Sequence, residues 1–186
     1  MKVLVLLAVV CVAMALHQYF RVAEDVWGAL LNWKVVYRLE FNWKNARARN
    51  IAALCLLVPF GLLLGKYVQP LWKCYALLAG YVLVREGVGV LLPMRMLDQE
   101  WRGGVRRTLW TYFLPFFAVF LVTSLLGGAF GWEVRAAHMV ETALLFLLDF
   151  VAVFKILRGG YSLFPTFLYL CALEILPLGV LVAFAA

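Results

Sequence analysis

Long apolar stretches recur along this chain of 186 residues and constrain its fold more than any other feature. Each is about as long as the ~20 residues that an α-helix needs to cross the ~30 Å hydrocarbon core of a bilayer. Hydrophobic residues make up 66% of the sequence and charged residues 15%, whereas a soluble domain is about half apolar and about a quarter charged. The sequence therefore predicts an all-α polytopic membrane protein with a single transmembrane domain over residues 1–186.

Six membrane spans are expected from the apolar stretches. Their approximate ranges are 3–20, 51–67, 71–94, 108–128, 136–157 and 162–183. The first stretch also resembles a secretory signal, because Lys2 precedes an apolar core that ends in small residues. We expect it to be retained as a span, since its cleavage would leave the basic segment that follows outside the cytoplasm. In the second span, Gly61 and Gly65 form a G-x-x-x-G pattern that lets a neighbouring helix approach closely.

Residues 22–45, between the first two spans, combine basic side chains with one apolar helical face. That face is formed by Val26, Leu30, Trp33, Tyr37 and Phe41. A helix with this pattern lies in the membrane interface. We expect one interfacial amphipathic helix on the cytoplasmic side, with Trp27 and Trp33 at headgroup depth. Packing on the protein's own bundle is preferred over a docking surface for a partner.

Lysine and arginine are distributed unevenly between the predicted loops. Twelve fall on one side, namely Arg21, Lys34, Arg38, Lys44, Arg47, Arg49, Arg95, Arg102, Arg106, Arg107, Lys155 and Arg158. Four fall on the other side, namely Lys2, Lys66, Lys73 and Arg135. The positive-inside rule then places both termini in the periplasm. This asymmetry explains the net charge of +7 without a nucleic-acid partner, and we expect none.

Five charged residues fall inside the predicted spans: Arg85, Glu86, Glu141, Asp149 and Glu174. A charge at the bilayer centre costs about 2.5–3.5 kcal/mol, so such residues find partners and are candidate functional residues. The alternative is an ion pair that ties helices together. From its predicted depth, Arg85 is expected to reach Asp149 or Glu174. Glu141 lies three residues after His138, on the same helical face, where the two can interact directly.

Pro177 lies three residues after Glu174 within the last predicted span. A proline inside a helix removes one hydrogen bond and clashes with the carbonyl four residues earlier, here that of Leu173. A freed carbonyl within a membrane needs a new partner. Glu174 and Pro177 are therefore expected to form a polar, locally unwound spot that either holds helices together or carries protons.

The C-terminal segment 155–178 carries a recognisable signature. Its residues are Arg158 and Gly159, followed by Leu168, Tyr169, Leu170, Cys171, Leu173, Glu174, Ile175 and Pro177. This LYLC-x-LEI-x-P pattern resembles a family of uncharacterised multi-span inner-membrane proteins of Bacteroidota. The resemblance implies a bacterial inner membrane and directs attention to Glu174, but it implies no reaction.

The motifs of enzymes that use metals, nucleophilic serine, nucleotides or dinucleotides are absent from the sequence. We therefore expect no enzymatic activity, no metal and no cofactor. His17 and His138 are expected near opposite membrane faces, which argues against a haem held by both. The favoured function is an accessory or scaffold subunit of an envelope membrane complex, in contact with lipid and with partner membrane proteins or further copies of itself. The alternative is a small proton- or ion-coupled transporter that uses Glu174, Asp149 and Arg85.

Overall fold

The protein is helical throughout the part of the chain that the structure describes. The computed structural model describes residues 2–32, 34–67, 70–91, 99–159 and 161–175, which contain helices and turns but no strand. The helices are α1 (Lys2–Tyr19), α2 (Ala23–Leu31), α3 (Lys34–Phe41), α4 (Trp43–Leu64), α5 (Leu71–Leu91), α6 (Gln99–Phe130), α7 (Arg135–Arg158), α8 (Leu163–Leu170) and a π-helix (Cys171–Ile175). The predicted all-α class is confirmed.

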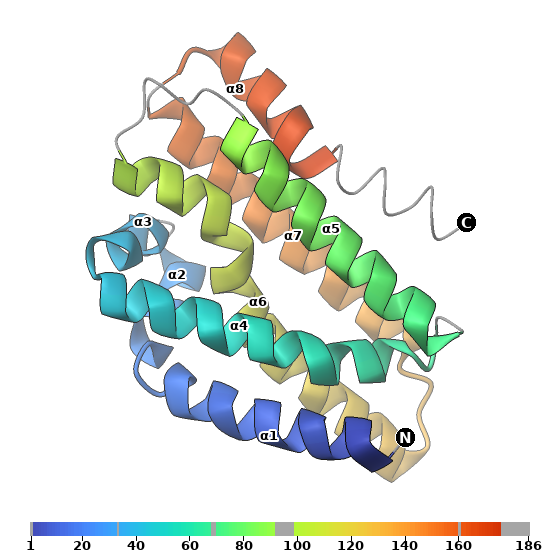
Figure 1. Ribbon diagram of the computed structural model, residues 1–186. Helices are drawn as coiled ribbons and strands as arrows, with labels where there is room; N and C mark the ends of the chain where they lie inside the picture. Colours follow the sequence, from blue (N-terminus) through green and yellow to red (C-terminus); the bar gives the residue numbers. More distant parts are fainter. Residues whose placement is uncertain (1, 33, 68–69, 92–98, 160, 176–186) are drawn as a thin grey trace.

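Helix α6 lies at the centre of the arrangement (Figure 1). It contacts α2, α3, α4 and α7, while α1 packs along α4, and α8 packs on α7. Ten consecutive residues of α6, 108–117, are buried, as expected for a helix surrounded by others. Phe60 of α4 packs edge-on against Phe113 and Phe120, with ring centroids 5.3 and 5.2 Å away. The turn after α6 uses Gly131, whose φ of +69° favours glycine.

The single interfacial helix expected over residues 22–45 is instead divided into α2, α3 and the first turn of α4. Asn32 adopts an extended conformation after α2, and its side chain accepts a hydrogen bond from the Lys34 amide at 3.1 Å. Asn42 caps α4 in the same way, through the Lys44 amide at 3.2 Å. Asparagine next to a helix start satisfies a free amide of the first helical turn. Asn32 therefore separates α2 from α3, and Asn42 separates α3 from α4. Trp33 lies outside the described residues.

Helices α2 and α3 pack on the protein's own bundle, since both contact α6. Of the predicted apolar face, Val26 is fully buried and Leu30 is half-buried, whereas Phe41 is exposed. The apolar face is thus split between the protein core and the surface. Their depth relative to a membrane stays a prediction.

Fewer helices qualify as membrane spans than the six expected. Among the described residues, two stretches are long and apolar enough to cross a membrane, Trp43–Leu64 and Arg102–Phe130. A third is possible if Val3–Tyr19 and Ala23–Leu31, which are bent by 76°, form one broken span. The physical reason for the difference is that charged residues interrupt α5 and α7. Of the last expected span, 162–183, residues 176–183 lie outside the described residues. The expectation of six spans is therefore not supported.

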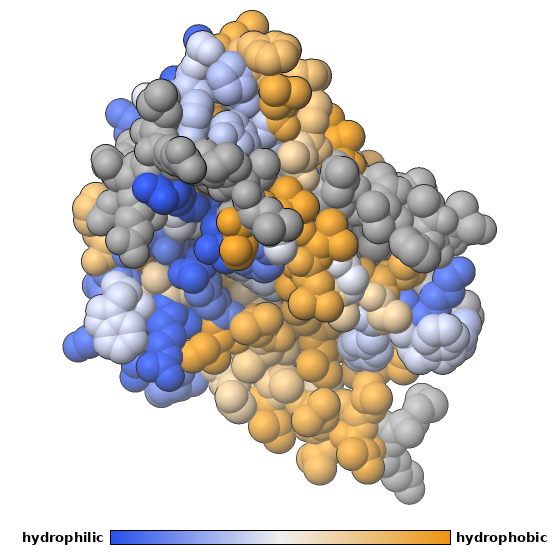
Figure 2. Space-filling model, turned by 45° about the horizontal axis from the view of Figure 1, so that its top comes forward, coloured by the Kyte–Doolittle hydropathy of each residue, from blue (hydrophilic) through white to orange (hydrophobic). Residues whose placement is uncertain are grey.

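The surface separates into polar and apolar regions. Figure 2 shows hydrophilic residues gathered on the left of the visible face, and a broad hydrophobic area over its centre and lower part. Exposed aliphatic and aromatic side chains lie along α1, α7 and α8; examples are Leu6, Val9, Leu144, Leu147, Phe164 and Phe167. Large exposed apolar surfaces mark contact with a membrane or with a partner.

Candidate functional site

Arg85 of α5 lies at the centre of a buried ionic cluster. Its Nη2 atom donates to Asp149 Oδ2 of α7 at 2.7 Å and to Glu174 Oε1 of the π-helix at 2.8 Å. The three side chains are 4%, 0% and 7% exposed. Both expected partners of Arg85 are therefore engaged at once. The cation holds together three elements that are far apart in the sequence.

Helix α6 completes the surroundings of Arg85. Nη2 also donates to Thr108 Oγ1 at 3.2 Å, and Nη1 donates to the backbone carbonyl of Arg106 at 2.9 Å. Nη2 carries two hydrogens and serves three acceptors. Meanwhile Arg85 Nε and Asp149 Oδ1 are buried without a hydrogen-bond partner among the described residues. With both acids ionised, the trio of Arg85, Asp149 and Glu174 carries one surplus negative charge.

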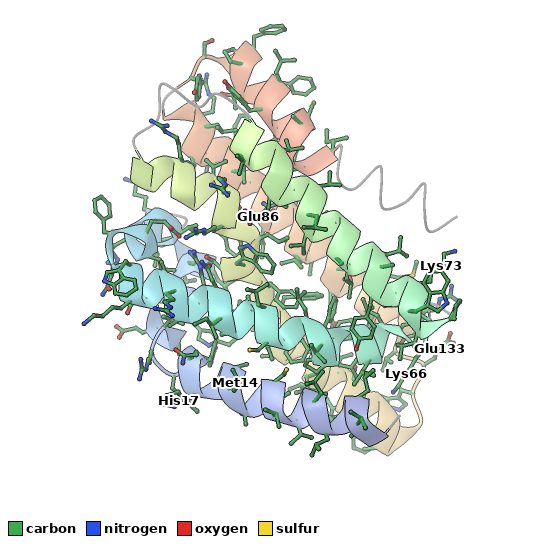
Figure 3. The ribbon with its side chains drawn as sticks, in the orientation of Figure 1. Met14, His17, Lys66, Lys73, Glu86 and Glu133 are labelled. Atoms are coloured by element: carbon green, nitrogen blue, oxygen red, sulfur yellow. The ribbon has the colours of Figure 1, made fainter. Side chains whose placement is uncertain are left out.

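Glu86, the neighbour of Arg85, forms a separate bridge to α6. Its Oε2 accepts from Arg106 Nη2 at 3.1 Å, and its Oε1 accepts from Trp110 Nε1 at 2.9 Å. Figure 3 shows Glu86 between α5 and α6. Both carboxylate oxygens are used, and about 30% of the Glu86 side chain is exposed. This bridge is a half-buried link between two helices and is separate from the trio around Arg85.

A second buried arginine, Arg49 of α4, was not singled out from the sequence. Its side chain is fully buried and pairs with Glu40 of α3 at 2.5 Å, and it also donates to Thr111 of α6 at 3.2 Å. Glu40 accepts a further bond from Arg107 at 3.3 Å. Sequence reasoning assigned Arg49 to a cytoplasmic loop because it precedes the apolar run. The signal that reveals it is Asn42, whose capping role extends α4 backwards to include Arg49.

The expected pair of His138 and Glu141 is present in α7. His138 Nδ1 lies 2.8 Å from Glu141 Oε2, and its ring stacks on Phe120 with centroids 3.7 Å apart. Ser124 and Thr123 of α6 bond to the histidine and to the glutamate, at 3.1 and 2.5 Å. Glu141 lies eight residues before Asp149, about 12 Å along the helix axis. The structure thus places Glu141 in a separate polar contact between α6 and α7.

Glu174 lies in a non-α segment, because residues Cys171–Ile175 form a π-helix. Short π-helical segments inside α-helices occur frequently at functional sites. Pro177, which was expected to unwind this region, lies outside the described residues. The expected local departure from α-helix around Glu174 is present.

Tyr81 connects the cluster to an apolar cavity. The cavity measures about 140 Å³ and lies between α4, α5, α6 and α7, where its lining includes Phe60, Tyr81, Trp110 and Leu145. The Tyr81 hydroxyl is buried without a hydrogen-bond partner among the described residues. One turn of α5 separates Tyr81 from Arg85. A mainly apolar cavity thus adjoins a charged interior.

The cluster can act as a clamp between helices or as a site that holds a proton or a small cation. The described residues contain no group of three His, Cys, Asp or Glu side chains able to hold a metal ion. Comparisons with protein-family models, curated proteins and solved structures find no match to this chain.

Proposed function

We propose that this protein is an accessory or scaffold subunit of a membrane complex in the bacterial inner membrane. The observation that carries the proposal is a set of ion pairs between helices whose formal charges cancel in total. Four basic and four acidic side chains take part: Arg49, Arg85, Arg106 and Arg107 with Glu40, Glu86, Asp149 and Glu174. These pairs form three groups that together link α3, α4, α5, α6, α7 and the π-helix, and the formal charges of the whole ionic network cancel.

Cancelled charges favour a static role. Each of the eight side chains has a partner of opposite sign, so none requires a mobile counter-ion to offset its burial. Directional bonds between side chains also fix how the helices sit relative to one another. A protein built this way presents constant outer surfaces, and its exposed apolar faces on α1, α7 and α8 suit contact with lipid and with partner membrane proteins or further copies of itself.

The proposed orientation places the basic end of the molecule in the cytoplasm and both termini in the periplasm. Lys66, Lys73 and Glu133 lie together at one end of the molecule, whereas His17 lies toward the other end (Figure 3). The first end is the one assigned to the periplasm. The grouping of the basic residues at the opposite end, together with the resemblance of the C-terminal segment to inner-membrane proteins, supports this orientation.

The proposal is tested by purification of the tagged full-length chain from its native membrane in a mild detergent. We expect a partner protein to remain at a fixed molar ratio through size-exclusion chromatography, measured by quantitative mass spectrometry. A matched sample of an Arg85→Met variant should lose the partner, because the clamp that orders the helices is broken. A chain that purifies alone, or only with copies of itself, would overturn the accessory role.

One observation favours a second candidate, a proton- or ion-coupled transporter. Asp149 and Glu174 share one nitrogen of Arg85, which leaves a surplus negative charge inside the trio and one unpartnered oxygen on Asp149. A site that holds two carboxylates against one cation is suited to bind and release a proton. Glu40 pairs with two arginines, Arg49 and Arg107, and that group carries one surplus positive charge. It offsets the charge of the trio in the total, but none of the ion pairs among the described residues joins it to the trio.

Glu174→Gln separates the two candidates, because glutamine keeps the size of the side chain but does not exchange a proton. For a transporter, proton flux into proteoliposomes with a pH-sensitive dye should disappear in this variant while its circular dichroism spectrum is unchanged. For a scaffold, the variant should keep its partner at the ratio seen for the wild type. Equal proton flux in the two proteins would remove the transporter candidate.

A further inference from the structure

A basic pocket lies where the end of α1 meets the start of α4. It measures about 310 Å³ and is lined by Gln18, Arg21, Trp43, Lys44, Arg47, Ala48 and Ile51. It belongs to neither the ionic network nor the apolar cavity described above. Unlike that mainly apolar cavity, it is lined by polar as well as apolar residues.

The pocket lining contains several basic residues and no acidic residue. Three of its seven lining residues are Lys or Arg, and none is Asp or Glu. None of the ion pairs found among the described residues involves Arg21, Lys44 or Arg47. Their neighbours in the sequence are engaged elsewhere, since Arg49 pairs with Glu40 and Arg38 with Asp25. An anion from outside the chain is therefore the matching ligand for these three cations.

The immediate surroundings have the composition of a membrane interface. The Arg47 guanidinium lies 5.9 Å from the ring of Trp43, which is itself exposed. Within about one helical turn of the pocket, α1 exposes Met14 and Leu16, and α4 exposes Leu54. Tryptophan and basic residues gather at headgroup depth, with apolar side chains deeper in the bilayer.

We propose that this pocket binds the phosphate of an anionic phospholipid, with the acyl chains along the exposed apolar surface of α1 and α4. Guanidinium groups bind phosphate oxygens through charge-assisted and often bidentate hydrogen bonds, and Lys44 adds a further positive charge. Basic pockets between helices on the cytoplasmic side are suited to lipid headgroups. The apolar surface next to the pocket favours a lipid over free phosphate, because a free anion gains nothing from it.

The proposal is tested with the purified full-length protein in a zwitterionic detergent, by native mass spectrometry of lipid binding. Phosphatidylglycerol, phosphatidylcholine and inorganic phosphate are added separately. The test variant carries Arg21→Gln, Lys44→Gln and Arg47→Gln. A matched control carries Lys34→Gln, Lys155→Gln and Arg158→Gln, which remove the same charge from exposed positions outside the pocket.

We expect the wild type and the control to bind phosphatidylglycerol with similar affinity and in preference to phosphatidylcholine. Each basic residue strengthens binding to anionic lipid about fivefold, so the test variant should bind on the order of 100-fold more weakly. Equal weakening in the control would show that net charge alone attracts the lipid, and would overturn the site. A site that binds inorganic phosphate as tightly as phosphatidylglycerol, or that does not prefer it to phosphatidylcholine, would overturn the lipid assignment.

The fold of the test variant is checked by its melting temperature and its elution from a sizing column. If the triple variant does not fold, the single variants Arg21→Gln and Arg47→Gln replace it, each with an expected loss of about fivefold. Arg158→Gln is then the control. Single variants that bind phosphatidylglycerol as tightly as the wild type would overturn the proposal.

Discussion

Replacing Arg85 with methionine leaves Asp149 and Glu174 buried without their shared cation. The two carboxylates are 0% and 7% exposed, so water does not replace the lost bonds to Nη2. Removal of one partner from a buried ion pair costs about 3–5 kcal/mol, against a total stability of about 5–15 kcal/mol for a typical domain. Protonation of the acids limits the loss, because a neutral carboxyl is far less costly to bury than a charged one.

A triple variant tests more stringently whether the loss of stability comes from unpaired buried acids. Arg85→Met combined with Asp149→Val and Glu174→Met replaces the whole trio with apolar side chains. Replacement of a buried ionic triad by apolar residues of similar volume is often neutral, or stabilising by about 1–4 kcal/mol. We therefore expect the triple variant to be more stable than Arg85→Met by at least about 2 kcal/mol. Thr108 keeps a hydrogen bond in both variants, to the Val105 carbonyl at 3.2 Å.

The assay is reversible unfolding in mixed detergent and dodecyl sulfate micelles, followed by circular dichroism. Arg38→Met is the control, because Arg38 pairs with Asp25 at 3.2 Å while 67% of its side chain is exposed. Exposed pairs contribute about 0–1 kcal/mol, so the control should stay within that range. If Arg85→Met unfolds like the control, or if the triple variant is less stable than Arg85→Met, the trio does not stabilise the fold as argued.

Three further results are expected. Gly61→Ala should destabilise by about 1–3 kcal/mol because its Cβ meets a tyrosine ring of α5, whereas Gly80→Ala, with open space around it, should stabilise by up to about 1 kcal/mol in the same unfolding assay. Trp110→Phe should cost about 1.5–3 kcal/mol, since it removes a hydrogen bond to the Glu86 carboxylate. A reporter active only in the periplasm should work when fused after Ala186 and fail when fused ahead of α4; the reverse pattern would contradict the orientation.

The sequence predicted the helices better than it predicted their use in a membrane. Apolar stretches near span length locate α1, α5 and α7 closely, because a long run of such residues forms a helix in either a membrane or a core. For α6 they give the end but not the start, which lies at Gln99. For the same reason, an apolar run does not show whether its helix faces lipid or lies in the protein core. Helix α6 contains a stretch apolar enough to cross a membrane, yet its residues 108–117 are buried among other helices. Hydropathy alone does not separate these cases, and the charged residues within α5 and α7 are what leaves six spans without support.

The pairing of Arg85 was predictable because a buried cation has few possible partners. Three acidic residues lie in the last two predicted spans, and depth excludes Glu141. The simultaneous contact with Asp149 and Glu174 was not predictable, because it depends on how α7 and the π-helix approach α5. Arg49 was missed for a different reason: helix capping, rather than hydropathy, determines where α4 begins.

Two pairs of adjacent residues, Arg85 with Glu86 and Arg106 with Arg107, explain how the ion pairs link so many helices. Neighbours on an α-helix point about 100° apart, so they do not face the same partner. Arg85 accordingly pairs with Asp149 of α7 and Glu174 of the π-helix, while Glu86 pairs with Arg106 of α6. Arg107, next to Arg106, pairs instead with Glu40 of α3. Each pair therefore acts as a branch point. In the first pair, exchanging Arg85 with Glu86 should break the links to α7, the π-helix and α6, although composition and hydropathy stay the same.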